Sequence, residues 1–187
     1  MTLQELEQSV LRLNQALLSP VAKKKASTPI EKYDVANKGY VDSRVGIEGR
    51  SHNPATTSIP INNNGSLINI DLQTNDFANG ITWNSTFHYF SVVTAGRYLV
   101  HLSVGFGSEP ITGGTSQFAA IKQNGTEVSR GYTLNNGVSG EVETAHVTDI
   151  LNCAAGDYIE FFAGHLSNAT VSIQTGSNLT FATISIA

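Results

Sequence analysis

Apolar residues follow two different spacings along the 187-residue chain. Near the N-terminus they recur at alternating steps of three and four residues, the spacing of one face of an α-helix. From Thr57 onward they alternate with polar residues, as in a half-buried β-strand. The pattern therefore predicts a short N-terminal helical segment followed by a mainly β domain.

The helix is expected to begin at Thr2, because Thr2 and Glu5 fit a capping box, and to stop before Pro20. Its length would be roughly 26 Å at 1.5 Å per residue. A helix this short must bury its apolar stripe, either on its own domain or in an assembly. We favour a self-associating stalk or a docked peg, because a lysine-bearing spacer follows at 23–25. The stripe is a heptad seam of Leu3, Leu6, Val10, Leu13 and Leu17.

The second part of the chain reads as roughly eight to ten short strands separated by turn residues. Asn124-Gly125 between two of them is a strong hairpin signal, because both residues tolerate positive φ. No helical pattern lies between the strands, so an antiparallel jelly-roll β-sandwich is expected. The predicted strands are 67–72, 86–93, 97–104, 117–123, 126–132, 141–152, 158–164, 170–174 and 179–186.

Charge divides the chain near residue 50. Residues 1–50 hold eight Lys or Arg and six Asp or Glu, a net charge of +2, whereas residues 51–187 hold three and nine, a net charge of −6. We therefore expect an N-terminal anchor and linker at 1–50 and a head domain at 51–187. Three cations are too few for a phosphate-binding face, so a nucleic-acid partner is not expected. No apolar run is long enough for a membrane span, and the acidic start does not resemble a secretory signal.

Residues 36–45, ANKGYVDSRV, resemble a segment that recurs in bacteriophage fibre and other virion proteins, commonly ahead of a trimeric domain. Asn37 would cap a short helix that Gly46 and Gly49 end. On that helix Tyr40, Val41 and Val45 would share one face and take part in anchoring or oligomerisation.

A second resemblance lies in the head. The aromatic residues Phe87 and Phe90, followed by Ala95-Gly96-Arg97-Tyr98-Leu99-Val100, resemble the core signature of TNF-like heads, including those of complement-type collagenous proteins. The resemblance implies a jelly roll that assembles as a tight homotrimer around a three-fold axis.

Two strands appear apolar on both faces, namely 158–163 and 182–186. A two-layer sandwich buries one face of each strand, so a second apolar face suggests a subunit interface. The candidates for the trimer interface of the head are Tyr158, Phe162, Ile184 and Ile186.

No constellation of catalytic residues stands out, so we expect a protein that is not an enzyme and that needs no cofactor or metal. The five histidines, His52, His88, His101, His146 and His165, lack metal-ligand spacing. A trimer could bring His88, His101 and His146 together on its three-fold axis, but nothing in the sequence favours an ion site there. Glu141 and Glu143 share one strand, whereas glycosidase pairs converge from separate elements. Cys153 is expected to pack as a small apolar residue.

Three functional hypotheses remain. The first is a trimeric capsid decoration, cement or head-fibre protein, made in the host cytoplasm and displayed on the outer surface of the virion. It would bind the major capsid protein or another virion protein through residues 1–50. The alternative is the receptor-binding tip of a phage tail fibre, contacting a host receptor or glycan through loops near 62–66, 107–116 and 133–140. The third is a TNF-like ligand unrelated to phage.

Overall fold

The computed structural model describes residues 46–54, 59–61, 65–107, 115–134, 142–167 and 170–187. These residues form thirteen strands and, within the described ranges, no helix. The two helices expected in the N-terminal segment, with Leu3, Leu6, Val10, Leu13, Leu17, Tyr40, Val41 and Val45, lie outside the described residues. The strands are β1 (Glu48–His52), β2 (Ile59–Ile61), β3 (Ile68–Asn69), β4 (Thr74–Asn79), β5 (Ile81–Asn84), β6 (Tyr89–Val92), β7 (Gly96–Phe106), β8 (Ser116–Gln123), β9 (Thr126–Leu134), β10 (Glu143–Cys153), β11 (Tyr158–His165), β12 (Val171–Ile173) and β13 (Phe181–Ile186).

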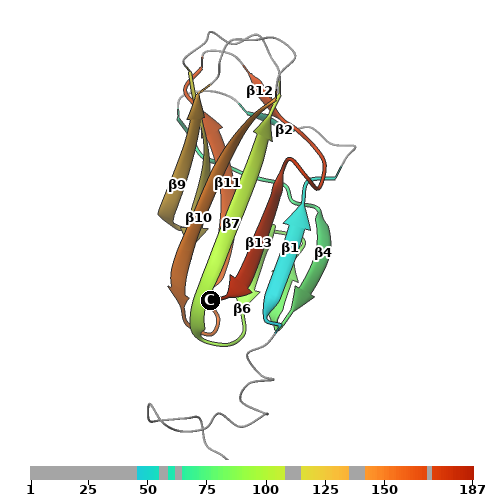
Figure 1. The fold of residues 1–187 in the computed structure, drawn as a ribbon, viewed down its shortest axis with the longest axis vertical. Coiled ribbons are helices and arrows are strands. Elements are labelled where there is room, and N and C mark those ends of the chain that lie inside the picture. The colour runs from blue at the N-terminus through green and yellow to red at the C-terminus, as the bar shows by residue number, and fades with distance from the viewer. Residues whose placement is uncertain (1–45, 55–58, 62–64, 108–114, 135–141, 168–169) are drawn as a thin grey trace, which may run out of the picture. The chain divides into compact units, whose positions relative to one another are not determined.

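The strands form two antiparallel sheets packed face to face, which confirms the expected jelly-roll sandwich (Figure 1). Sheet A has the order β2-β12-β7-β13-β1-β4, with β10 paired along the other edge of β7. Sheet B has the order β5-β6-β11-β8-β9, with the short β3 paired to β11. In Figure 1 the strands β10, β7, β13, β1 and β4 of sheet A lie side by side, so the view falls onto the outer face of that sheet.

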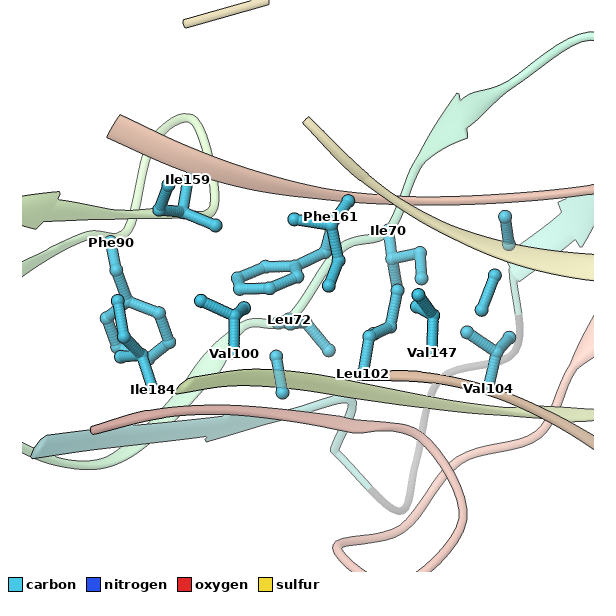
Figure 2. Packing of buried hydrophobic residues seen from close by; sticks show 14 of the residues in the cluster. Ile70, Leu72, Phe90, Val100, Leu102, Val104, Val147, Ile159, Phe161 and Ile184 are labelled. Atoms are coloured by element: carbon cyan, nitrogen blue, oxygen red, sulfur yellow. The ribbon is translucent and has the colours of Figure 1, made fainter. Parts of the chain in front are cut away.

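Sequence alternation predicts β7 correctly. Tyr98, Val100, Leu102 and Val104 are fully buried in the core, as their spacing indicated. Figure 2 shows Val100, Leu102 and Val104 facing Phe161, Ile70 and Ile159 across the space between the sheets. Because apolar burial is the main favourable term in folding, this shared layer holds the two sheets together.

The predicted Asn-Gly hairpin is also confirmed. Asn124 and Gly125 have φ values of 52° and 78°, and β8 and β9 pair on either side of them. Two consecutive residues with positive φ give the turn a twist that matches the flanking strands. The Asn124 side chain additionally accepts a hydrogen bond from the Tyr158 amide at 3.0 Å, which ties this turn to β11.

The predicted strand at 67–72 is longer than the observed β3. The Ile70 amide still donates to the Phe161 carbonyl at 2.9 Å, but the Leu72 amide turns back to the Ile70 carbonyl at 3.0 Å. Both side chains are fully buried. Apolar alternation continues into this turn because the side chains enter the core without strand pairing.

The sandwich begins before residue 50. The compact unit that contains it starts at Arg44, and β1 begins at Glu48. Gly49, expected to end a helix, lies within β1, between β13 and β4. A Cβ atom at Gly49 would lie 2.5 Å from Ile81 Cδ1, so packing against β5 requires a glycine there.

Candidate functional site

The outer face of sheet A is built by the odd-numbered positions of β7. Because the neighbouring even-numbered positions are buried, Leu99 and His101 point away from the core. The strand register places Ile150 of β10 beside Leu99 and Thr148 beside His101. On the other side of β7, Thr183 of β13 lies beside His101. The strands β10, β7 and β13 therefore present one continuous surface.

This face exposes large apolar side chains. Leu99 is 41% exposed and its register partner Ile150 is 45% exposed. Phe77 on β4, in register with Arg50 of β1, is 45% exposed. Large apolar groups on a sheet face that no other part of the described chain covers are typical of a subunit interface. We call Phe77, Leu99, Ile150 and their neighbours on this face the assembly face.

A group of rings lies in the middle of the assembly face. The His101 and His146 rings stack with centroids 5.8 Å apart, and Phe181 lies 5.6 Å from His101. The Arg50 guanidinium sits 4.7 Å above the Phe181 ring. Burial, and then the charge of His146, lower the pKa of His101. A 2.7 Å hydrogen bond between His101 Nδ1 and the Thr148 hydroxyl holds the ring in one orientation, while burial and the charge of His146 favour its neutral form.

Acidic and basic side chains form ion pairs along the border of this face. Asp76 Oδ1 lies 2.8 Å from His52 Nδ1, and Asp76 Oδ2 lies 3.7 Å from an Arg50 guanidinium nitrogen. These partly exposed pairs contribute little to folding stability, because solvent screens them. They do fix Arg50 over the Phe181 ring, so the aromatic part of the face keeps a defined shape.

The edge strand β9 supplies a second exposed apolar surface. Tyr132 and Leu134 are each 62% exposed. The backbone of β9 passes very close to β10 at Gly131, where a Cβ atom would lie 1.7 Å from the His146 carbonyl oxygen. This close approach brings the edges of the two sheets together beside the assembly face.

The four residues proposed for the head trimer interface do not come together, because they lie on different sides of their sheets. Tyr158 and Phe162 are half-buried on the outer face of sheet B. Ile184 is 1% exposed and belongs to the core, so it cannot contact another subunit and that prediction is wrong. Ile186 also packs against the core. The outward positions of β13 are Phe181, Thr183 and Ser185, of which only the first is strongly apolar.

The sequence pattern did not lead us to predict Leu99 and Ile150 as exposed residues, although the sequence carries a signal for this pair. Tyr98-Leu99-Val100 and Ile150-Leu151 each place two large apolar residues next to one another within a strand. Adjacent strand residues point to opposite faces, so one member of each pair must point outward. Phe77 gives no such signal, because β4 has the mostly polar sequence TNDFAN.

The described residues offer little reactive chemistry. In the ranges that the structure covers, no group of three or more His, Cys, Asp or Glu side chains is placed to hold a metal ion. Burial, and then the charge of Asp157, raise the pKa of Cys153 to about 11, so its thiol stays protonated at neutral pH. Searching the same ranges for a helix of membrane-spanning length and hydropathy finds none.

Comparison with solved structures identifies the fold. Eiger TNF from S. frugiperda superposes with a TM-score of 0.55 at 12% identity, over 75% of this chain and 92% of that chain. Murine APRIL superposes with TM-scores of 0.52 at pH 5.0 and 0.51 at pH 8.0, at 10% and 12% identity, over 75% of this chain and 99% of each of those. At such identities the likeness shows the fold alone, and the described residues form a TNF-like jelly roll. No family model and no curated protein matches the chain.

Proposed function

We propose that this chain is a trimeric structural protein of a bacteriophage virion, of the capsid decoration, cement or head-fibre type. Its sandwich would form the exposed head, and its N-terminal segment would attach to the major capsid protein or another virion protein. Two features support this role: the phage-like string at 36–45 and a TNF-like head with an uncovered assembly face. The proposal gives the protein no catalytic role and places it on the outer surface of the particle.

The observation that supports the trimer is the exposed pair Leu99 and Ile150 on the neighbouring strands β7 and β10 of sheet A. A three-fold ring requires a heterologous contact, in which two different surfaces of the same chain meet. The chain offers both: the assembly face and the exposed side chains Tyr132 and Leu134 of β9. In the proposed trimer, the β9 edge of one subunit covers the assembly face of the next.

Analytical ultracentrifugation of the full chain tests this arrangement. The wild type should sediment as a trimer, whereas Leu99→Glu should sediment as a monomer, because a charge placed in an apolar contact loses its hydration without gaining a partner. Val93→Glu is the matched control, since Val93 is 58% exposed but lies in the turn before β7, outside the assembly face. A wild-type monomer, or a Leu99→Glu trimer, would refute the proposed interface.

The attachment role is tested separately on virus particles. A chain that lacks residues 1–43 keeps the whole unit that begins at Arg44, including Ile47, which is buried in the core. It should remain a folded trimer that no longer binds capsids, as judged by immunogold electron microscopy. Full decoration by the truncated chain would contradict attachment through the N-terminal segment. Labelling at the tail alone would contradict the capsid role and favour the tail-fibre alternative.

A further inference from the structure

The turn between β5 and β6 displays an aromatic side chain to solvent. Phe87 is 64% exposed, the most exposed large apolar side chain among the described residues. It lies on the outer side of sheet B, away from the assembly face, because its ring stacks on the outward-pointing Tyr89. Burying the assembly face in a trimer would therefore leave Phe87 accessible.

The turn holds Phe87 in one position. The Asn84 side chain accepts hydrogen bonds from the amides of Thr86 and Phe87, both at 3.0 Å. The next residue, His88, has a φ of 56°, a conformation that is uncommon outside glycine. It is fixed by a 2.8 Å backbone bond to the Asn84 carbonyl and by Asp71, which lies 2.8 Å from its Nε2. Residues kept in such backbone conformations cluster at ligand sites, where a rigid turn lowers the entropic cost of binding.

Three rings form a row across this end of sheet B. Phe87 and Tyr89 are nearly parallel, with an interplanar angle of 9° and centroids 6.3 Å apart. Tyr158 of β11 continues the row, 5.2 Å from Tyr89. Tyr158 and Tyr89 are tilted by 40°, so the rings do not share one plane, and the exposed Phe87 ring is the one that offers the negative face of its π-system to polarised C–H groups. The pyranose ring of a sugar presents such C–H groups on one face.

A carboxylate and an ammonium group lie beside the rings. Glu160 is in register with Tyr89 and lies two residues from Tyr158, so its side chain points to the same face. One of its carboxylate oxygens accepts from the Gly125 amide at 3.1 Å, and a carboxylate has capacity for further donors. The Lys122 ammonium lies 4.0 Å from the centroid of the Phe162 ring. Lys122 is in register with Glu160, so the border carries no net charge and suits an uncharged ligand whose hydroxyl groups both donate and accept hydrogen bonds.

We propose that Phe87, Tyr89 and Tyr158 form a binding platform for an uncharged glycan, with the exposed Phe87 ring stacking on a pyranose face, the two tyrosines beside it, and Glu160 accepting bonds from the hydroxyl groups of the sugar. The ligand class follows from two features together: an exposed aromatic ring held in a rigid turn, and a carboxylate on the same side of the sheet. The platform does not depend on the virion role or on the trimer, since each protomer carries all four residues. A trimer would present three platforms and gain avidity for a multivalent glycan surface.

The test measures binding of the full chain to neutral oligosaccharides of glucose, galactose and N-acetylglucosamine, and to their sialylated counterparts, on an array and then by calorimetry. At least one neutral oligosaccharide should bind, and Phe87→Ala should weaken that binding by roughly tenfold or more, since one stacking contact is lost. Phe87→Trp should retain it, because a flat ring is kept. Glu160→Gln should weaken binding with an unchanged oligomeric state.

Leu166→Ala is the matched control. Leu166 is 56% exposed but follows the opposite end of β11, about 25 Å from Tyr158 at the usual rise of a strand. It should bind sugars as the wild type does. No neutral oligosaccharide bound at millimolar concentration, binding of sialylated glycans alone, or unchanged binding by Phe87→Ala would each overturn the platform. None of these results would alter the sedimentation test of the trimer.

Discussion

Ile184 and Leu99 test whether sheet A sends one side chain into the core and the other to its outer face, as their exposures indicate. Both are large aliphatic residues on neighbouring strands, and their register positions differ by one residue. Ile184 is 1% exposed and packs in the core, whereas Leu99 is 41% exposed on the assembly face. Truncating the first should damage the fold itself, and truncating the second should damage only association.

The expected magnitudes differ accordingly. Ile184→Ala removes a fully buried side chain and leaves a cavity, which should lower the free energy of unfolding by about 3 kcal/mol. With a urea dependence of about 2 kcal/mol per molar, the unfolding midpoint should fall by about 1.5 M. Leu99→Ala removes a side chain that is already partly hydrated in one protomer, so its cost within the protomer should be about 1 kcal/mol or less.

Urea unfolding followed by fluorescence of Trp83 measures both, since Trp83 is the single tryptophan and its ring lies 4.7 Å from Phe90. For Ile184→Ala the measurement is made in a Leu99→Glu background, which we expect to be monomeric, so that association does not contribute to stability. There Ile184→Ala should still lower the midpoint by the full amount. An unchanged midpoint in that background would refute the assignment of Ile184 to the core and restore it as an interface residue.

Of three further predictions, one concerns packing at the edge of the sandwich and two concern the pH dependence of its stability. Gly131→Ala places a Cβ against the His146 carbonyl oxygen and should cost about 3 kcal/mol; an unchanged thermal midpoint would contradict the close approach of β9 and β10. Burial and His146 lower the pKa of His101, so the unfolded chain binds its proton more tightly. The free energy of unfolding should therefore fall as pH drops through the ordinary histidine pKa of 6.5, and level off below the folded pKa. Urea denaturation between neutral and mildly acidic pH measures this decrease, and the His101→Gln variant should not show it. Hydrogen bonds from Asn124, the Ala154 amide and Gln123 lower the pKa of Asp157, so its stabilisation is present above the ordinary carboxyl value and lost as pH falls through the folded pKa. Asp157→Asn should then cost about 1 kcal/mol at neutral pH and almost nothing below the folded pKa, where urea titrations of the two proteins should coincide.

Local pattern was sufficient for the long strands and their inward faces. Alternation in β7 identifies Tyr98, Val100 and Leu102 as core residues, and Asn124-Gly125 identifies the hairpin. Both follow from short-range physics: the pleat sends neighbouring side chains to opposite faces, and the turn needs residues that tolerate positive φ. The mainly β class and the jelly-roll architecture follow from the same signals repeated along the chain.

The local sequence pattern could predict only part of the candidate site. Leu99 and Ile150 carry a local signal, because each adjoins another large apolar residue within its strand. Nothing in the local sequence of β1 indicates that Gly49 must fit against Ile81, thirty-two positions away, or that Phe87 and Tyr158 lie in one row of rings. Those relations depend on which strands pair across the chain.

The sequence by itself determined which residues alternate, where the chain turns, and that charge changes near residue 50. Only the tertiary structure decided that Ile184 points inward, that Phe77 joins the assembly face, and that Glu48–His52 pairs as a strand with β13 and β4. The physical reason is that alternation is a property of a single strand. Burial depends on the partner strand and on the opposite sheet, which come from distant parts of the chain.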